Sequence, residues 1–175
     1  MSWDKELEEL RHREGLAEQM GGGEKVARQH SRGKMDARAR LAALVDPGSF
    51  REIGKIAGKA SYDQDGNLEH ILPAPFLFGK AEINGRPVVA TADDFTIRGG
   101  AADAGISRKM VQAEKMAHEL KLHIVRMIDG TGGGGSVKTL EQIGATYIPA
   151  VPGWSDVVKN LDTVPVVALA LGPTA

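Results

Sequence analysis

Residues Leu122–Thr139 read LHIVRMIDGTGGGGSVKT, and the fold and the chemistry of the chain are best inferred outward from this stretch. Its first part, Leu122–Ile128, is mostly β-branched or long aliphatic, which is typical of a buried strand. Asp129 ends this run, and five glycines follow within six positions. A helix is expected from Ser136, so the stretch predicts a strand, a glycine-rich turn and a helix.

The glycine-rich turn leaves its main-chain amides almost without side-chain cover. A turn of this kind between a strand and a helix directs several N–H groups toward a phosphate, a carboxylate or a developing oxyanion. We therefore predict an anion-binding loop, in which main-chain amides carry the chemistry instead of a reactive side chain.

Three weaker interpretations of the same loop stay open. A nucleotide-binding P-loop needs lysine and then Ser or Thr directly after its second spaced glycine. Here Ser136 stands at the lysine position, and Lys138 and Thr139 follow Val137 instead of glycine. A dinucleotide fingerprint can be fitted to almost any glycine run, so it carries little weight. The glycines could also be no more than a flexible connection between strand and helix.

The residues around this loop predict an α/β domain. FLFGKAEI and RPVVATAD, joined by Asn84-Gly85, predict a hairpin over residues 76–93. An apolar stripe predicts a helix over Gly105–Leu120, and a shorter helix is expected over Trp154–Leu161. Val164–Leu171 is predicted to be another buried strand. This order favours parallel strands covered by helices.

The first half of the chain is less regular. Apolar spacing predicts helices over Asp4–Met20, ending at three glycines, and over Asp36–Leu44. Glu24–Lys34 is polar and basic, and Asp46–Ser49 is a predicted turn. Phe50–Pro75 has no clear periodicity beyond an exposed loop around residues 61–67.

Composition excludes several classes of function. The 175 residues carry a formal charge of -1 with 26% charged residues, so nothing indicates a nucleic-acid or anionic-membrane partner. Cysteine is absent, which excludes disulfides and thiolate nucleophiles and fits a reducing compartment. The charged N-terminus lacks the apolar core of a secretory signal, and no apolar run has the length of a membrane span. We expect a cytoplasmic protein, or a mitochondrial matrix protein in a eukaryote.

Titratable side chains offer poorer candidates than the glycine loop. The five histidines lack metal-ligand spacing, so no metal site is predicted, and two of them, His118 and His123, are expected on a helix face and a strand. Asp93 and Asp94 could form an acid/base pair. Adjacent residues of an extended segment point to opposite sides, however, so a capping or turn role is favoured.

Five stretches in the same order resemble the carboxyltransferase (β) subunits of biotin-dependent acyl-CoA carboxylases. Residues 29–41, QHSRGKMDARARL, are similar to the N-terminal signature of that family, and residues 44–52, LVDPGSFRE, continue it. Residues 79–85, 93–100 (DDFTIRGG) and 172–175 (GPTA) fall where the family has its hairpin, its glycine-containing loop and its Gly-Pro-x-Ala turn.

This resemblance implies a crotonase-like spiral of ββα units. It implies a helical N-terminal segment over residues 1–49, followed over residues 50–175 by the first part of an acyl-CoA carboxyltransferase domain. The implied reaction transfers CO2 from carboxybiotin to the α-carbon of an acyl-CoA through an enolate. Amides in a water-poor site stabilise an enolate oxygen by a few kcal/mol per donor.

The resemblance also implies site residues. Gly132, Gly133 and Gly134 correspond to the Ser-Gly-Gly-Ala segment of the family, after the strand-ending Asp129, although this chain has extra glycine and lacks the Ala-Arg that often follows. The residues expected to contact acyl-CoA are Arg98, Gly99, Gly100, Arg108 and Lys109. For each of the three basic residues taken alone, a solvated surface charge is the favoured alternative.

In the family, Gly-Pro-x-Ala is followed at once by a Gly-Gly pair, which this sequence does not include. We therefore expect an N-terminal fragment that has no carboxyltransferase activity by itself. A non-catalytic half domain that binds CoA or a partner subunit is the alternative. The implied partners are a biotin carboxylase and its biotin carboxyl carrier, together with further copies of the chain, because Val164–Leu171 would present an unpaired edge.

Overall fold

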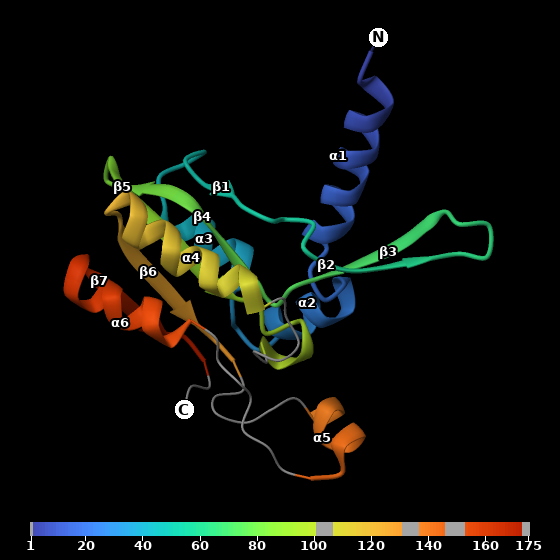
Figure 1. The fold of residues 1–175 in the computed structure, drawn as a ribbon. Helices are drawn as coiled ribbons and strands as arrows, with labels where there is room; N and C mark the ends of the chain where they lie inside the picture. Colours follow the sequence, from blue (N-terminus) through green and yellow to red (C-terminus); the bar gives the residue numbers. More distant parts are fainter. Residues whose placement is uncertain (1, 101–106, 131–136, 146–152, 173–175) are drawn as a thin grey trace.

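The computed structural model describes residues 2–100, 107–130, 137–145 and 153–172. A mixed sheet lies at the centre of the molecule, with helices on both of its faces (Figure 1). In chain order the elements are α1 (Asp4–Glu18), α2 (Gly23–His30), α3 (Ala37–Leu44), β1 (Arg51–Glu52), β2 (Gly58–Tyr62), β3 (Leu68–Pro73), β4 (Phe76–Ile83), β5 (Arg86–Asp93), the 3-10 turn η1 (Arg98–Gly100), α4 (Ser107–Leu120), β6 (His123–Ile128), α5 (Val137–Ile143), α6 (Trp154–Thr163) and β7 (Val166–Ala170).

The hairpin predicted from Asn84-Gly85 is confirmed. β4 and β5 pair antiparallel from Phe76 opposite Asp93 to Ile83 opposite Arg86. Asn84 and Gly85 have φ of 51° and 73°, the left-handed values that a two-residue hairpin turn requires. This hairpin supplies two of the three interior strands of the sheet, including the central strand β5.

The parallel half of the sheet is also confirmed. The strand order is β1-β4-β5-β6-β7, with β5 and β6 parallel and β6 and β7 parallel. α4 connects β5 to β6 and covers the face of β4, β5 and β6, and α6 packs beside α4. The carboxyl ends of β5, β6 and β7 consequently meet at one edge of the molecule.

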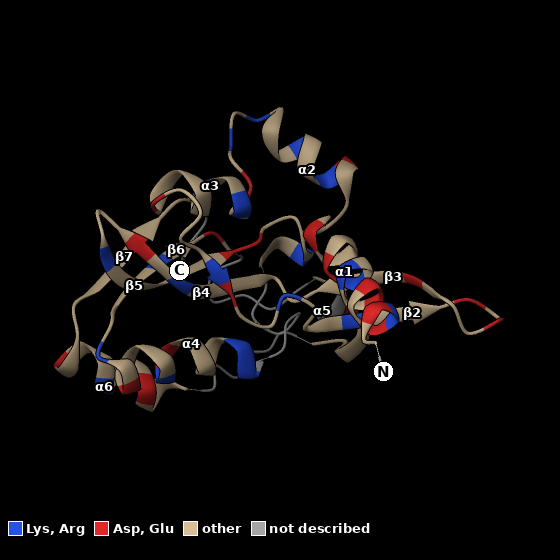
Figure 2. Cartoon of the chain, turned by 90° about the horizontal axis from the view of Figure 1, so that it is seen from above, with Lys and Arg blue, Asp and Glu red and all other residues tan. Residues whose placement is uncertain are grey.

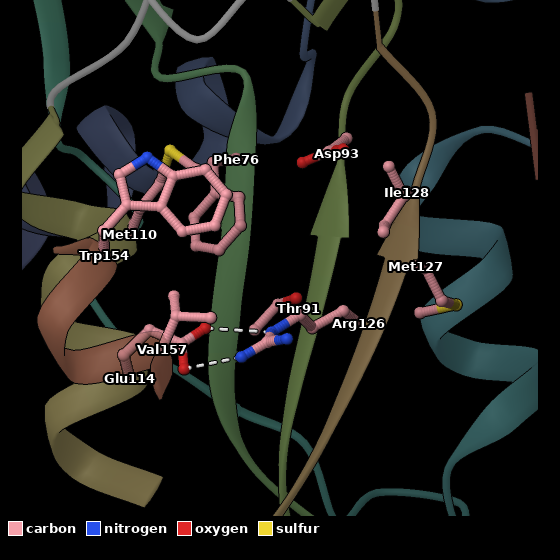
Figure 3. Close-up of a pocket in the computed structure, with 10 residues that line it drawn as sticks. All are labelled: Phe76, Thr91, Asp93, Met110, Glu114, Arg126, Met127, Ile128, Trp154 and Val157. Atoms are coloured by element: carbon pink, nitrogen blue, oxygen red, sulfur yellow. Dashed lines mark hydrogen bonds and ion pairs between the residues drawn. The ribbon is translucent and has the colours of Figure 1, made fainter. Parts of the chain in front are cut away.

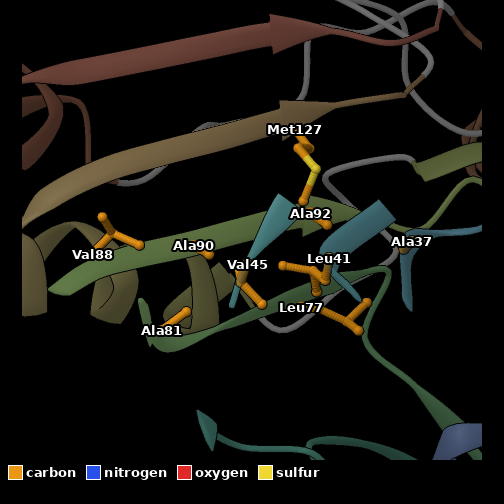
Figure 4. Close-up of a cluster of buried hydrophobic side chains, with 9 residues drawn as sticks. All are labelled: Ala37, Leu41, Val45, Leu77, Ala81, Val88, Ala90, Ala92 and Met127. Carbon is orange, nitrogen blue, oxygen red and sulfur yellow. The ribbon is translucent and has the colours of Figure 1, made fainter. Parts of the chain in front are cut away.

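The two faces of the sheet bury different cores. Leu77, Ala90, Ala92 and Met127 point toward α3, where Leu41 and Val45 pack against them (Figure 4). On the other face Phe78, Val89 and Ile124 pack against α4. There α4 presents two fully buried alanines, Ala113 and Ala117, which allow the helix to lie close to the sheet.

Three expectations from the sequence were incomplete or wrong. The polar segment Glu24–Lys34 contains α2, and the segment before β4 contains the β2–β3 hairpin, neither of which had been predicted. The Val164–Leu171 strand exists as β7, but it is not buried. Three of its five residues are exposed, and among the residues described in the structure β7 is an edge strand paired with β6.

The helices α1, α4 and α6 carry both acidic and basic residues, with acidic residues in the majority on α1 (Figure 2). None of the helices in the described part of the chain is both long and apolar enough to span a membrane.

Candidate functional site

The carboxyl ends of the parallel strands bring three backbone segments together. Asp93 ends β5, Asp129 follows β6 directly, and Gly172 lies just after β7. The N–H of Asp129 donates a hydrogen bond of 3.1 Å to Asp93 Oδ2. A Cβ added to Gly172 would overlap the Asp129 carboxylate, so the chain after β7 lies directly against this side chain. Asp129 is therefore the point at which the three strand ends meet.

The charge of Asp129 is matched by an arginine from α3. Arg40 Nη2 lies 2.5 Å from Asp129 Oδ2, and the two side chains are only 8% and 1% exposed. α3 begins with a conventional cap, in which the Asp36 carboxylate accepts the N–H of Ala39 at 2.8 Å. The capped helix thus places the buried guanidinium of Arg40 at the carboxyl end of β6, where the ion pair links α3 to the sheet.

The loop after β5 lies against the start of the glycine-rich loop. A Cβ built on Gly100 would come within 2.5 Å of the carbonyl oxygen of Asp129 and within 3.0 Å of Gly130 Cα. Gly100 also has a φ of 67°, in the left-handed region that favours glycine. Its position therefore requires glycine for two independent reasons, and it fixes how close the two loops can come.

A cavity of about 250 Å³ adjoins this junction on the α4 face of the sheet (Figure 3). Alternate residues of the strands form one wall, and α4 and α6 form the other. The lining residues are Phe76, Thr91, Asp93, Met110, Glu114, Arg126, Met127, Ile128, Trp154 and Val157. The Met127 side chain itself belongs to the core on the opposite face.

An ion pair occupies one end of this cavity. Arg126 donates from Nε to Glu114 Oε1 at 2.9 Å and from Nη2 to Glu114 Oε2 at 2.8 Å. Asn160 of α6, which is fully buried, donates to the same Oε2 at 2.7 Å. Because the two charged groups pair in this bidentate way, their hydrogen bonds are directed at each other, and the pair forms the polar end of a mainly apolar cavity.

The two adjacent aspartates have different surroundings, as the alternation of an extended segment predicts. Asp94 holds the turn after β5, since its Oδ1 accepts the N–H of Thr96 at 2.9 Å and the Thr96 hydroxyl at 2.6 Å. Asp93 lines the cavity. Burial raises the pKa of its carboxyl from 3.8 to about 6, and the Asp129 carboxylate adds to the rise, whereas the Asp129 N–H and Arg40 oppose it.

This pKa predicts a specific dependence of stability on pH. The unfolded chain ionises Asp93 near its ordinary value of 3.8, whereas the folded chain ionises it near 6. The ionised carboxylate therefore destabilises the folded state above pH 6, and this cost disappears as the pH falls below about 4. For Asp93→Asn we expect a gain over the parent of about 3 kcal/mol at pH 7.5 that falls below about 1 kcal/mol at pH 4, measured by urea unfolding.

Asp63→Asn is the control for this comparison, because hydrogen bonds from Asn67 hold the pKa of Asp63 below its ordinary value. Removal of that carboxylate should cost stability at neutral pH, with the opposite sign. Equal effects of Asp93→Asn at pH 4 and pH 7.5 would contradict an elevated pKa of Asp93.

The structure describes some of the predicted site residues and leaves others outside the described part of the chain. Gly132, Gly133 and Gly134 lie outside the described residues, so their role stays a prediction. Arg98, Gly99 and Gly100 form η1, beside the end of β6. Their predicted contact with acyl-CoA is not tested by the geometry.

The other two predicted basic contacts differ in exposure. Arg108 is exposed at the start of α4. Lys109 is buried, with its Nζ 3.8 Å from Glu52 Oε1, and burial lowers its pKa. Glu52 also pairs with Arg38 at 2.9 Å. A phosphate contact by Lys109 would require exchange of Glu52 for the phosphate.

Sequence reasoning missed Arg40, Met110 and the Glu114–Arg126 pair, because each acquires its role through a partner distant in the chain. A helical-face signal was available only for Met110. His118 and His123 lie on α4 and β6 as predicted. Within residues that the structure describes, no group of three or more His, Asp or Glu side chains is arranged to hold a metal ion.

Comparison with known proteins connects this geometry to one family. A family model described as "Carboxyl transferase domain" matches residues 28–173. The methylmalonyl-CoA carboxyltransferase 12S subunit of Propionibacterium freudenreichii subsp. shermanii is 38% identical over 112 residues, which are 63% of this chain and 21% of that protein. The propionyl-CoA carboxylase carboxyltransferase subunit of Haloferax mediterranei is 31% identical over 133 residues, which are 75% of this chain and 26% of that protein.

Solved structures show the same architecture. The transcarboxylase 12S structure with methylmalonyl-coenzyme A and methylmalonic acid bound aligns with a TM-score of 0.69 at 27% identity, over 99% of this chain and 33% of that one. The form with hydrolysed methylmalonyl-coenzyme A bound gives a TM-score of 0.71. The fold is thus crotonase-like, as predicted, and the chain spans a third or less of the length of these relatives.

Proposed function

The chain belongs to the carboxyl transferase domain family, and from that premise we propose that it provides the acyl-CoA side of a biotin-dependent carboxyltransferase. The reaction moves a carboxyl group from carboxybiotin to the α-carbon of an acyl-CoA thioester. The observation that carries the proposal is the match of the family model to residues 28–173, which include all of the strand ends that converge on Asp129.

The geometry at the strand ends supports this function. Ligands of parallel α/β sheets bind outside the carboxyl ends of the strands, which is where η1, Gly130 and Gly172 come together. Removing the α-proton of a thioester leaves negative charge on its oxygen, and main-chain amides stabilise such an oxygen without a titratable group. The glycine-rich loop begins at this point.

We assign the residue roles on the same basis. Gly132, Gly133 and Gly134 hold the enolate oxygen through their amides. Arg98, Gly99, Gly100 and Arg108 meet the CoA moiety, and Lys109 joins them if it leaves Glu52. Asp129 and Arg40 position the loops without contact with the substrate.

The remaining components are proposed from the relatives. Biotin, delivered by a carrier protein and loaded by a biotin carboxylase, supplies the carboxyl group. The transcarboxylase 12S structures are hexamers, and we propose that this chain also assembles with further copies. The proposed location is the cytoplasm, or the mitochondrial matrix in a eukaryote.

Thermal unfolding with ligands tests the proposal. Propionyl-CoA at about 100 times its Kd should stabilise the purified chain by about 2.7 kcal/mol, which raises Tm by roughly 5–10 °C for a chain of this size. ATP with magnesium should have no effect. Stabilisation by ATP with magnesium alone would favour the P-loop interpretation, and no effect of any CoA compound would contradict the proposal.

The alternative is a non-catalytic half domain that binds CoA or a partner. Measurement of carboxyl transfer distinguishes it from the proposed function. The proposed function in its catalytic form requires carboxyl transfer between methylmalonyl-CoA and free biotin once the chain is combined with its partner subunits. CoA binding without transfer in that assembly would favour the alternative.

A further inference from the structure

One end of the cavity under α4 and α6 lies where the proposed substrate loops begin. Asp93 and Ile128, the last residues of β5 and β6, both line it. The next residues along the chain are the Asp94 turn on one side and Asp129-Gly130 on the other. A group that enters the cavity past these two side chains is therefore continuous with anything held by the loops.

The chemistry of the walls changes along the cavity. Met110, Trp154 and Val157 supply apolar surface from the helices, and Phe76 adds to it from β4 (Figure 3). The end away from the loops is closed by the Glu114–Arg126 pair, whose hydrogen bonds are directed at each other and at Asn160. Burial of an apolar group along this wall lowers its free energy of binding, whereas contact with the ion pair adds no favourable free energy.

The cavity exists because α4 contacts the sheet closely at only one end. Ala113 and Ala117 lie against Phe78 and Ile124 in a dry core. Met110, one turn before Ala113, and Glu114, the residue after it, line the cavity with longer side chains that leave space between the layers. The space is therefore bounded by a fixed core and does not require the sheet to open.

We propose that this cavity receives the acyl chain of the thioester and selects apolar chains of short to medium length. The inference rests on the proposed function and adds the substrate class. A volume of about 250 Å³ is below the roughly 300–1,000 Å³ of pockets that hold a whole drug-sized ligand, so CoA itself stays outside. At about 30 Å³ for a group the size of water, the cavity has room for roughly eight carbon-sized groups.

Trp154 and Val157 set the outer boundary of this space from α6. Trp154 is 64% exposed, so its indole covers the rim without being part of the core. Val157 faces the cavity, whereas its neighbour Val158 is 61% exposed on the outer side of the same helix. The two valines therefore form a matched pair for substitution.

Binding of a CoA series to the purified chain, measured by isothermal titration calorimetry, tests the inference. The series is CoA, acetyl-CoA, butyryl-CoA, hexanoyl-CoA and dodecanoyl-CoA. Affinity should rise about fourfold per added methylene from acetyl to hexanoyl, and dodecanoyl should add no more than the roughly two further groups that the cavity can hold. An affinity that is the same across the series overturns the inference.

Two substitutions locate the effect. Val157→Phe should fill the cavity and reduce the hexanoyl-to-CoA affinity ratio at least tenfold, whereas Val158→Phe should leave that ratio unchanged. Trp154→Ala removes an exposed side chain, so folding is retained, and it should extend the rise in affinity to dodecanoyl-CoA. Equal ratios for both phenylalanine variants, together with no change for Trp154→Ala, would overturn the inference.

The outcomes separate the inference from the function on which it rests. Loss of binding of every CoA compound by the unsubstituted chain contradicts the proposed function. Normal CoA binding, with an acyl-length preference that does not respond to Val157 or Trp154, contradicts only the acyl-chain cavity.

Discussion

Replacing Arg40 with methionine is expected to lower the free energy of unfolding by about 3–5 kcal/mol. The substitution leaves the Asp129 carboxylate buried without its guanidinium partner, and removal of one member of a buried ion pair typically costs this much. Asp129→Asn should cost a similar amount, because it leaves Arg40 buried. The measurement is urea unfolding followed by tryptophan fluorescence and circular dichroism.

Two further variants make this prediction specific. Arg28→Met removes an arginine whose partner Glu24 is 91% exposed, and it should change stability by less than about 0.5 kcal/mol. The double variant Arg40→Met with Asp129→Leu eliminates both charges, so it should be more stable than either single variant. A loss below 1 kcal/mol for Arg40→Met would show that Asp129 finds compensation elsewhere.

Gly100→Ala is expected to cost roughly 2–5 kcal/mol. A left-handed φ of 67° costs an alanine about 1–2 kcal/mol. The new methyl group would also stand 2.5 Å from the Asp129 carbonyl oxygen, and overpacking of this kind costs about 1–3 kcal/mol. Because the loop after β5 must then move away from the end of β6, binding of propionyl-CoA should weaken together with stability.

Gly48→Ala separates the two contributions. Gly48 has nearly the same φ, 72°, but nothing lies within 4 Å of the position where its Cβ would be. We expect it to cost about 1–2 kcal/mol, from the backbone alone, and to leave propionyl-CoA binding unchanged. Equal losses for the two variants would indicate that η1 and the end of β6 can separate freely.

The elements that sequence reasoning predicted are those with a local signal. Asn84-Gly85 identifies a hairpin turn because of its φ requirement, and the apolar runs of β6 and β7 identify strands. The helix α2 is short and has only two apolar side chains, Val26 and Ala27, so its local signal is small; it packs by a buried Gln29, whose Nε2 donates to the Met35 carbonyl at 2.7 Å. The β2–β3 hairpin is largely exposed, so its strands do not alternate clearly between apolar and polar residues.

The site was predictable to the extent that it depends on glycine. The glycines of the loops after β5 and β6 are visible in the sequence, and Gly100 proved to stand at a close approach. The pairing of Arg40 with Asp129 was not visible, since neither residue differs in type from a surface charge and only the packing of α3 on the sheet brings them together. The cavity likewise depends on tertiary structure, because α6 supplies part of its wall.

The sheet ends differently on its two sides. β1 offers two ladder positions, whereas β7 offers five and, within the described part of the chain, pairs along one side only. Another strand that docks by main-chain hydrogen bonds would therefore find a usable template at β7 and hardly any at β1. Extension of this sheet by a further polypeptide segment is directional, and it would continue the parallel half, on the side that carries the strand ends around Asp129.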